Sequence, residues 1–292
     1  MRRVFCAALL LLSACARRDE IDVAAAISLQ DVLRDIAAAY ERRTHEHVAL
    51  NVAGSNVLAR QIRAGAPVDV FIAADEKTMS SVRSYVDMPM PLLSNRLVVV
   101  SNLPLRGLPD LARCNRIAIG DPSAVPAGVY AREALGALWP SLSSRVIPCE
   151  NVRAALAAVE AGNADAAIVY ATDARMARRT RVAFAITPGP RIVYPVAMVR
   201  DSPHRDAARR FVEFLRSKQG EEIFTRYGFT VWSAVAQPPL SHRLVFQSGG
   251  LAAALQPKRL TPQPPLSHHL VFESGGLAAA LQTSSNVRQK RG

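Results

Sequence analysis

The sequence predicts an α/β fold in which mostly parallel sheets are flanked by helices and divided between two lobes. Short apolar segments alternate with amphipathic segments from residue 21 onward, which is the pattern of successive βα units. The chain has 292 residues, which is enough to bury one large core or two smaller ones. Two blocks of alternating segments are followed by one last strand and helix, so we expect the chain to cross between the lobes twice.

The individual elements follow from the spacing of apolar residues. Segment 29–42 places Leu29, Val32, Leu33 and Ile36 on one helical face, and the apolar runs of a few residues indicate strands. The predicted strands are 21–27, 48–52, 68–73, 97–100, 116–120, 145–148, 166–170 and 193–199, and the predicted helices are 29–42, 57–64, 130–138, 152–161 and 204–224.

The first 18 residues have the features of an export signal. Arg2 and Arg3 precede a short apolar run, and Leu12-Ser13-Ala14-Cys15 is typical of a lipobox. This pattern resembles that of bacterial lipoproteins, which implies cleavage before Cys15 and lipidation of that residue. We therefore expect the mature chain to be anchored on the periplasmic or cell-surface side of a bacterial membrane. The alternative is an ordinary signal peptide in which Cys15 is incidental.

The C-terminal segment 235–292 is a separate part of the chain. Gln237–Gln256 recurs almost unchanged as Gln263–Gln282, and Pro-Pro and Gly-Gly pairs interrupt both copies. Two copies do not make a solenoid, so we expect a duplicated tail of low order.

Charge and motifs exclude several functions. The net charge is +12, but segment 19–234 is nearly balanced, with 26 basic and 23 acidic residues and no basic stripe, which argues against nucleic-acid binding. Neither a nucleophile elbow, a zinc-protease motif nor a phosphate-binding loop motif is present, so we predict that the protein is not an enzyme and needs no cofactor. His45 and His47 are better explained as a solvated pair than as metal ligands. Cys114 and Cys149 are expected at opposite ends of neighbouring parallel strands, too far apart for a disulfide.

Four polar turns each lie between a predicted strand and a predicted helix. Ser28 opens the first helix with Asp31 as its expected capping-box partner, and Gly54-Ser55-Asn56 opens the second. The segments 121–128 and 150–152 do the same later in the chain. Each turn directs free backbone N–H groups to the carboxyl edge of a sheet, where ligands of α/β proteins bind, and such helix termini favour anions.

Several sequence segments resemble those of the periplasmic molybdate-binding proteins of ABC transporters. In the first half these are Ala25-Ala26-Ile27-Ser28-Leu29, Leu58-Ala59-Arg60-Gln61-Ile62, 65–72 and Ala74-Asp75; later ones are Gly120-Asp121-Pro122, 125–131, Val152-Arg153, Ile168-Val169-Tyr170, Tyr194-Pro195-Val196 and Arg226-Tyr227-Gly228-Phe229. The similarity is collinear over residues 21–231. It implies a type II periplasmic binding protein fold with the ligand in the cleft between two lobes. We expect lobe boundaries at 19–94 plus 197–234 and at 95–196, with hinges near 94–97 and 194–196.

The same resemblance implies the ligand and its contacts. Ser28 and Ser55 would bind the anion through hydroxyl and backbone N–H groups, Ala127 and Val152 through backbone N–H, and Tyr170 through its hydroxyl. The ligand would be molybdate, with tungstate also accepted, and the partner would be the membrane permease of an ABC importer. Phosphate is disfavoured because a protonated oxyanion would find no acceptor. Sulfate or another tetrahedral oxyanion remains an alternative ligand, and a sensor or interaction protein on the same fold remains an alternative function.

Overall fold

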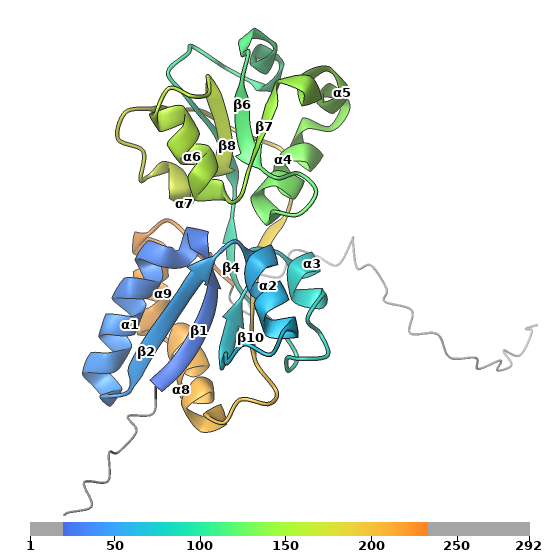
Figure 1. Cartoon of the computed structure of the whole chain (residues 1–292). Helices are drawn as coiled ribbons and strands as arrows, with labels where there is room; N and C mark the ends of the chain where they lie inside the picture. Colours follow the sequence, from blue (N-terminus) through green and yellow to red (C-terminus); the bar gives the residue numbers. More distant parts are fainter. Residues whose placement is uncertain (1–19, 233–292) are drawn as a thin grey trace, which may run out of the picture. The chain divides into compact units, whose positions relative to one another are not determined.

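The computed structural model describes residues 20–232, which form two α/β halves, each built on one sheet (Figure 1). We call residues 20–95 with 192–232 lobe 1, and residues 97–186 lobe 2. The strands are β1 Glu20–Ala26, β2 His47–Ala53, β3 Val70–Ile72, β4 Met90–Asn95, β5 Leu97–Ser101, β6 Ile117–Gly120, β7 Val146–Cys149, β8 Ala166–Tyr170, β9 Arg181–Ala185, β10 Ile192–Met198 and β11 Thr230–Val231. The α-helices are α1 Gln30–Thr44, α2 Ser55–Arg63, α3 Glu76–Ser80, α4 Pro126–Leu135, α5 Trp139–Leu142, α6 Val152–Glu160, α7 Ala171–Ala174, α8 Arg205–Leu215 and α9 Lys218–Arg226. The predicted α/β class, with two sheets flanked by helices, is confirmed.

The sheets are mixed, which corrects the expectation of mostly parallel strands. In lobe 1 the order is β11-β4-β10-β3-β1-β2; β1 is parallel to β2 and β3, whereas β10 is antiparallel to β3 and β4. In lobe 2 the order is β7-β6-β8-β5-β9; β6 is parallel to β7 and β8, whereas β5 is antiparallel to β8 and β9. The βα alternation predicts only the parallel units. The first strand that the chain forms after each crossing, β5 in lobe 2 and β10 in lobe 1, is antiparallel to both of its neighbours in the sheet.

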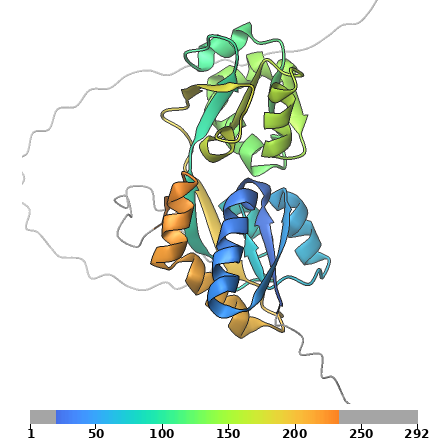
Figure 2. The same cartoon turned by 90° about the vertical axis from the view of Figure 1, so that its left-hand side faces the viewer.

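Helices cover both faces of the lobe 1 sheet (Figures 1 and 2). Along β1, Ile21, Val23 and Ala25 belong to the cluster that packs under α1, α8 and α9, while Ala24 belongs to the cluster under α2 and α3. This is the alternation expected of a strand whose two faces are both buried. Helix α1 lies beside α9, as Figure 2 shows, and the edge-to-face packing of Tyr40 on Phe211 joins α1 to α8.

The lobe 2 sheet carries α4 and α6 against β6 and β8. Cys114 lies just before β6 and Cys149 ends the parallel neighbour β7, so the two cysteines are at opposite ends of the sheet, and both are free thiols. At the end of α6, the carboxylate of Glu160 accepts hydrogen bonds from the Thr180 hydroxyl and from the backbone N–H groups of 178–180. These bonds, that of the Thr180 hydroxyl first, lower the pKa of Glu160 to about 2.

The chain crosses between the lobes twice, as predicted, and one crossing lies elsewhere than expected. The first crossing is at Arg96, between β4 and β5, within the expected segment. The second was expected at 194–196, but β10 pairs with β3 and β4 along its length and so belongs to lobe 1. The crossing is therefore at 187–191, between β9 and β10.

Most predicted elements agree with the structure to within a few residues, and the last helix is the clearest exception. The predicted helix 204–224 is two helices, α8 and α9, because Ser217 accepts a hydrogen bond from the N–H of Gly220 and starts a new helix. The sequence patterns also do not predict the short elements β4, β9, β11, α3, α5 and α7.

The export signal with Cys15 and the duplicated tail 235–292 lie outside the described residues. Within residues 20–232, no helix combines the length and the apolar character needed to cross a membrane.

Candidate functional site

A small pocket lies where the two lobes meet. It is lined at the carboxyl ends of β1, β2 and β3 in lobe 1 and of β6, β7 and β8 in lobe 2. Its volume is about 10 Å³, which is the room that a single water molecule needs. All five residues predicted for the site line this pocket, together with seven others: Ser28, Ser55, Ala127, Val152 and Tyr170, with Ala26, Ile27, Gly54, Ala74, Val125, Pro126 and Asn151.

Lobe 1 contributes two buried serines. Ser28 lies in the 3₁₀ turn Ile27–Leu29 that joins β1 to α1, and its Oγ is 3.1 Å from the hydroxyl oxygen of Tyr194. Ser55 is the first residue of α2, and its Oγ accepts a hydrogen bond of 3.0 Å from the N–H of Ala74. Ser55 Oγ makes no other hydrogen bond within residues 20–232, so its hydroxyl hydrogen is available to donate into the pocket.

The expected capping role of Ser28 is wrong. The N-cap residue of α1 is Leu29, and α1 has no side-chain cap. Ser28 bonds Tyr194 instead, and Asp31 forms an ion pair with Arg153 of lobe 2. Both side chains of the predicted capping box therefore bond residues that are distant in the sequence.

Three helices begin at the pocket, and their first N–H groups are free. Helices α2, α4 and α6 start at Ser55, Pro126 and Val152. The N–H groups of Ser55, Ala127 and Val152 belong to first turns and have no acceptor in their own helices, and no other group within residues 20–232 accepts a hydrogen bond from them. Each helix also directs the positive end of its dipole at the pocket.

Among the described residues that line the pocket, Tyr170 has the one hydroxyl without a hydrogen-bond partner. Its side chain is 1% exposed, and its hydroxyl makes no hydrogen bond within the described part of the chain. Burial, and secondarily the neighbouring Tyr194, raise the pKa of Tyr170 well above its ordinary value, so the hydroxyl keeps its proton and acts as a donor. An unpartnered buried hydroxyl costs stability unless a ligand satisfies it.

The pocket attracts anions without a cation. None of the described residues that line it is charged. Its positive potential therefore comes from backbone N–H groups, helix dipoles and hydroxyl hydrogens. Such a set of donors suits a ligand that offers only acceptors.

Sequence reasoning missed an ion pair that joins the lobes next to the pocket. Arg153 follows Val152 on α6, and its Nη2 lies 2.7 Å from Oδ2 of Asp31 on α1. The same guanidinium bonds the fully buried Asp173 within lobe 2. Burial raises the pKa of Asp173 to about 6 although Arg153 opposes the shift. Val152-Arg153 is one of the segments that resemble molybdate-binding proteins, but the partners of Arg153 are 20 and 122 residues away and have no local signal.

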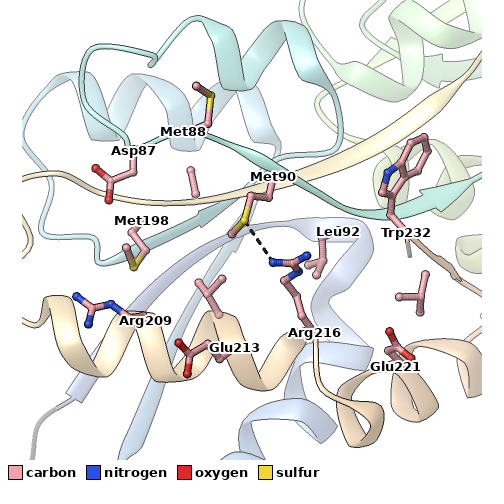
Figure 3. A pocket seen from close by; sticks show the side chains of 13 residues that line it. Asp87, Met88, Met90, Leu92, Met198, Arg209, Glu213, Arg216, Glu221 and Trp232 are labelled. Carbon is pink, nitrogen blue, oxygen red and sulfur yellow. Dashed lines mark hydrogen bonds between the residues drawn. The ribbon is translucent and has the colours of Figure 1, made fainter. Parts of the chain in front are cut away.

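A much larger pocket, of about 560 Å³, lies in lobe 1 between β4, β10, α8 and α9 (Figure 3). It is lined by apolar side chains such as Met90, Met198 and Trp232, and by three carboxylates, those of Asp87, Glu213 and Glu221. Two guanidinium groups, those of Arg209 and Arg216, also line this pocket, so its charges are mixed, and none of the predicted site residues is present. We therefore place the candidate site at the smaller pocket.

A metal-ion site is not favoured by the described residues. Within residues 20–232, no group of three or more His, Cys, Asp or Glu side chains gathers as a metal site requires. His45 caps the end of α1 in a left-handed conformation, and His47, the first residue of β2, has its Nδ1 2.7 Å from Oε1 of Glu41.

Comparison with known proteins shows the family of this chain. The family described as bacterial extracellular solute-binding protein matches residues 21–230. The molybdate-binding protein ModA of Escherichia coli is 39% identical over 240 residues, covering 75% of this chain and 92% of the relative. YvgL of Bacillus subtilis, named as an ABC transporter substrate-binding lipoprotein, is 35% identical over 225 residues, covering 72% of this chain and 86% of the relative.

Solved structures agree on the fold. The periplasmic molybdate-binding protein of Azotobacter vinelandii aligns with a TM-score of 0.66 at 19% identity, over 73% of this chain and all of that one. The family consists of extracellular solute-binding proteins, so a binding function outside the cytoplasm, rather than catalysis, is confirmed. The chain belongs to the bacterial extracellular solute-binding protein family and, within it, to the ModA family of molybdate-binding proteins.

Proposed function

We propose that this protein captures molybdate, and also tungstate, outside the cytoplasm and delivers it to the permease of an ABC importer. The observation that carries the proposal is the uncharged pocket between the lobes, to which three helix N-termini and the unpartnered hydroxyl of Tyr170 present donors. Its ligand class follows from that chemistry, and the similarity to ModA proteins supports the choice among tetrahedral anions.

Molybdate is a dianion with four acceptor oxygens and no hydrogen to donate near neutral pH. Hydrogen bonds to a charged group contribute about 1.5–3 kcal/mol each, so several of them together offset the cost of removing the anion from water. In this proposal Ser28 and Ser55 donate from hydroxyl and backbone N–H groups of lobe 1. Ala127 and Val152 donate from the backbone of lobe 2, and Tyr170 donates its phenolic hydrogen.

Binding requires the lobes to move. The volume of about 10 Å³ is less than a tetrahedral oxyanion fills, so the lobes must separate to admit it and then close around it. We assign the hinges to Arg96 and to 187–191, where the chain passes from one sheet to the other. The ion pair between Arg153 and Asp31 would hold the lobes together in the closed state. The permease would then bind the closed form and release the anion by opening it.

The N-terminal segment would keep the protein at the membrane. The lipobox ending at Cys15 and the lipoprotein name of the relative YvgL both support lipidation of Cys15. Metabolic labelling with a radioactive fatty acid tests this, because the label should be incorporated by the wild type and lost in Cys15→Ser.

Isothermal titration of the purified chain with molybdate, tungstate and sulfate tests the ligand. We expect one-to-one binding of molybdate and tungstate, and weaker binding of sulfate, which offers the same acceptors on a smaller ion. Ser55→Ala should lower molybdate affinity roughly tenfold or more, since it removes one donor to a charged ligand. Ser80→Ala, on the exposed side of α3, is the matched control and should bind like the wild type. Sulfate binding as tight as that of molybdate would move the assignment to a general oxyanion-binding protein.

A further inference from the structure

One arginine of lobe 2 lies between two carboxylates, one from each lobe. Arg153, on α6, bonds Asp173 of α7 through Nε and Asp31 of α1 through Nη2, the latter at 2.7 Å. Asp173 is fully buried, whereas Arg153 and Asp31 are partly exposed. The buried carboxylate therefore holds Arg153 within its own lobe, and opening of the lobes would separate only Asp31 from the guanidinium.

The three charged side chains are close to the proposed anion site. Each is within three residues of a predicted anion donor: Asp31 of Ser28, Arg153 of Val152, and Asp173 of Tyr170. Burial is the main cause of the raised pKa values of Tyr170 and Tyr194, and the negative charge of Asp173 adds to both shifts. Asp173 thus acts electrostatically on the hydroxyl that is proposed to bind the anion, and its charge opposes the binding of a dianion there.

Asp173 lacks the hydrogen bonds that a buried carboxylate needs. Its Oδ1 accepts a bond from Arg153, but Oδ2 is buried and has no partner within residues 20–232. Burial raises the pKa of Asp173 to about 6, Arg153 acts against this shift, and the neighbouring Asp31 adds to it. The guanidinium that neutralises Asp173 is thus shared with a second carboxylate.

The other charged side chains around α7 are directed away from Asp173. Helix α7 packs against α6, β5, β8 and β9, and β5 carries no charged residue. The remaining charged groups on or next to these elements, and on α1, lie elsewhere: Glu160 bonds the backbone of 178–180, Arg175 lies against Gly228, Arg34 faces Asp31, and Arg96 and Arg181 are exposed. Tyr170 and Tyr194 face the carboxyl as protonated hydroxyls.

Closure of the lobes and binding of the anion change the protonation of Asp173 in the same direction. Asp31 is held near Asp173 in the closed state and raises its pKa, and a bound dianion would raise this pKa further. Both negative charges move away when the lobes open. The pKa of Asp173 is therefore higher in the closed, liganded state than in the open state. Anion affinity is then greatest below the pKa of the closed state and decreases as the pH rises through it.

We propose that Asp173 is a positioning residue that holds Arg153 for lobe closure and takes up a proton from the solvent when the anion binds. The proton would be carried by Oδ2, the carboxyl oxygen without a partner. The carboxyl behind the dianion is then neutral, and Arg153 is available to Asp31 alone. This inference rests on the proposed function and goes beyond it by naming the group that links molybdate binding to pH.

Calorimetric titration with molybdate at pH 6.5, in two buffers of different ionisation enthalpy, measures the number of protons taken up. We expect about 0.2–0.9 proton per molybdate for the wild type, and an affinity about two- to tenfold higher at pH 6 than at pH 8. Asp173→Asn has nearly the same shape and cannot take up the proton, so its uptake should be abolished and its affinity should not vary over this range. Asp31→Asn, at the partly exposed side of the contact, should reduce the uptake, because it removes a charge that raises the pKa of Asp173.

Asp22→Asn is the matched control. Burial also raises the pKa of Asp22, but this residue lies near the start of β1, at the end of the strand away from the pocket. This variant should take up as many protons as the wild type. If the affinity of the wild type is the same at pH 6 and pH 8, or if Asp173→Asn or Asp31→Asn takes up as many protons as the wild type, the inference is overturned and the anion site is not. If the wild type binds no tetrahedral oxyanion at either pH, the proposed function itself fails and this inference fails with it.

Discussion

Replacement of Tyr170 by phenylalanine should change ligand affinity and the stability of the ligand-free protein in opposite directions. The Tyr170 hydroxyl is buried and has no partner within residues 20–232. The pocket beside it, of about 10 Å³, is at the lower limit for holding one water, so hydration of this hydroxyl is poor. Removing a buried, unsatisfied polar group recovers about 1–3 kcal/mol. For a folded part of this size, each kcal/mol corresponds to an increase in Tm of about 2–4 °C.

The expected loss of binding free energy is similar in size to the gain in stability. A hydrogen bond from the Tyr170 hydroxyl to a charged oxygen contributes about 1.5–3 kcal/mol, so molybdate affinity should fall roughly 10- to 150-fold. Calorimetric titration gives the affinity, and a thermal melt without ligand gives the stability. Tyr40→Phe is the control with the opposite expectation. The Tyr40 hydroxyl donates a hydrogen bond to Glu46, and burial together with Glu46 raises the pKa of Tyr40 to about 12. Loss of this hydroxyl should lower the Tm and leave the molybdate affinity unchanged.

A decrease in the Tm of ligand-free Tyr170→Phe as large as that of Tyr40→Phe would contradict this expectation. That result would mean that the Tyr170 hydroxyl already has a partner in solution. Unchanged molybdate affinity would equally exclude Tyr170 from the binding site.

Three further predictions concern lobe closure, packing and pH. Asp31→Asn removes the charge that pairs with Arg153 across the lobes, so the molybdate off-rate in stopped-flow measurements should rise several-fold; an unchanged off-rate would show that the pair does not hold the lobes closed. Gly128→Ala would place its methyl 1.9 Å from the carbonyl oxygen of Gly120, so chemical denaturation should show a loss of about 1–3 kcal/mol or more, and wild-type stability would contradict the packing described. The depressed pKa of Glu160 means that its stabilising effect is present above its unfolded pKa of about 4.5 and is lost as pH falls towards 2, so Glu160→Gln should flatten the acid-unfolding profile; parallel profiles would contradict this.

Much of the fold could be predicted because local sequence patterns indicate its strands and helices. The apolar runs and amphipathic periods predict most strands and helices, and the polar turns after the strands predict the edge of the sheet where the pocket lies. The two lobes were predictable from the return of the chain. The antiparallel pairings were not, because strand direction depends on how the chain re-enters each sheet.

The site itself was predictable where the chemistry is local to a turn. Three site residues lie in turns whose polar or glycine-rich composition indicates the start of a helix: Ser55, Ala127 and Val152. The contacts that orient the site are not local. Ser28 bonds Tyr194, which is 166 residues away in the sequence. Local sequence patterns therefore predicted an N-cap role for Ser28 that it does not have.

A crystal structure of the molybdate complex would show whether the donors between the lobes bind a tetrahedral oxyanion. Diffraction data collected near the molybdenum absorption edge locate the metal atom independently of the protein density. We expect one anomalous peak between the lobes, with the oxygens of the anion within hydrogen-bonding distance of five residues: Ser28, Ser55, Ala127, Val152 and Tyr170. A peak in the large lobe 1 pocket, or anion oxygens held by arginine or lysine side chains, would contradict it.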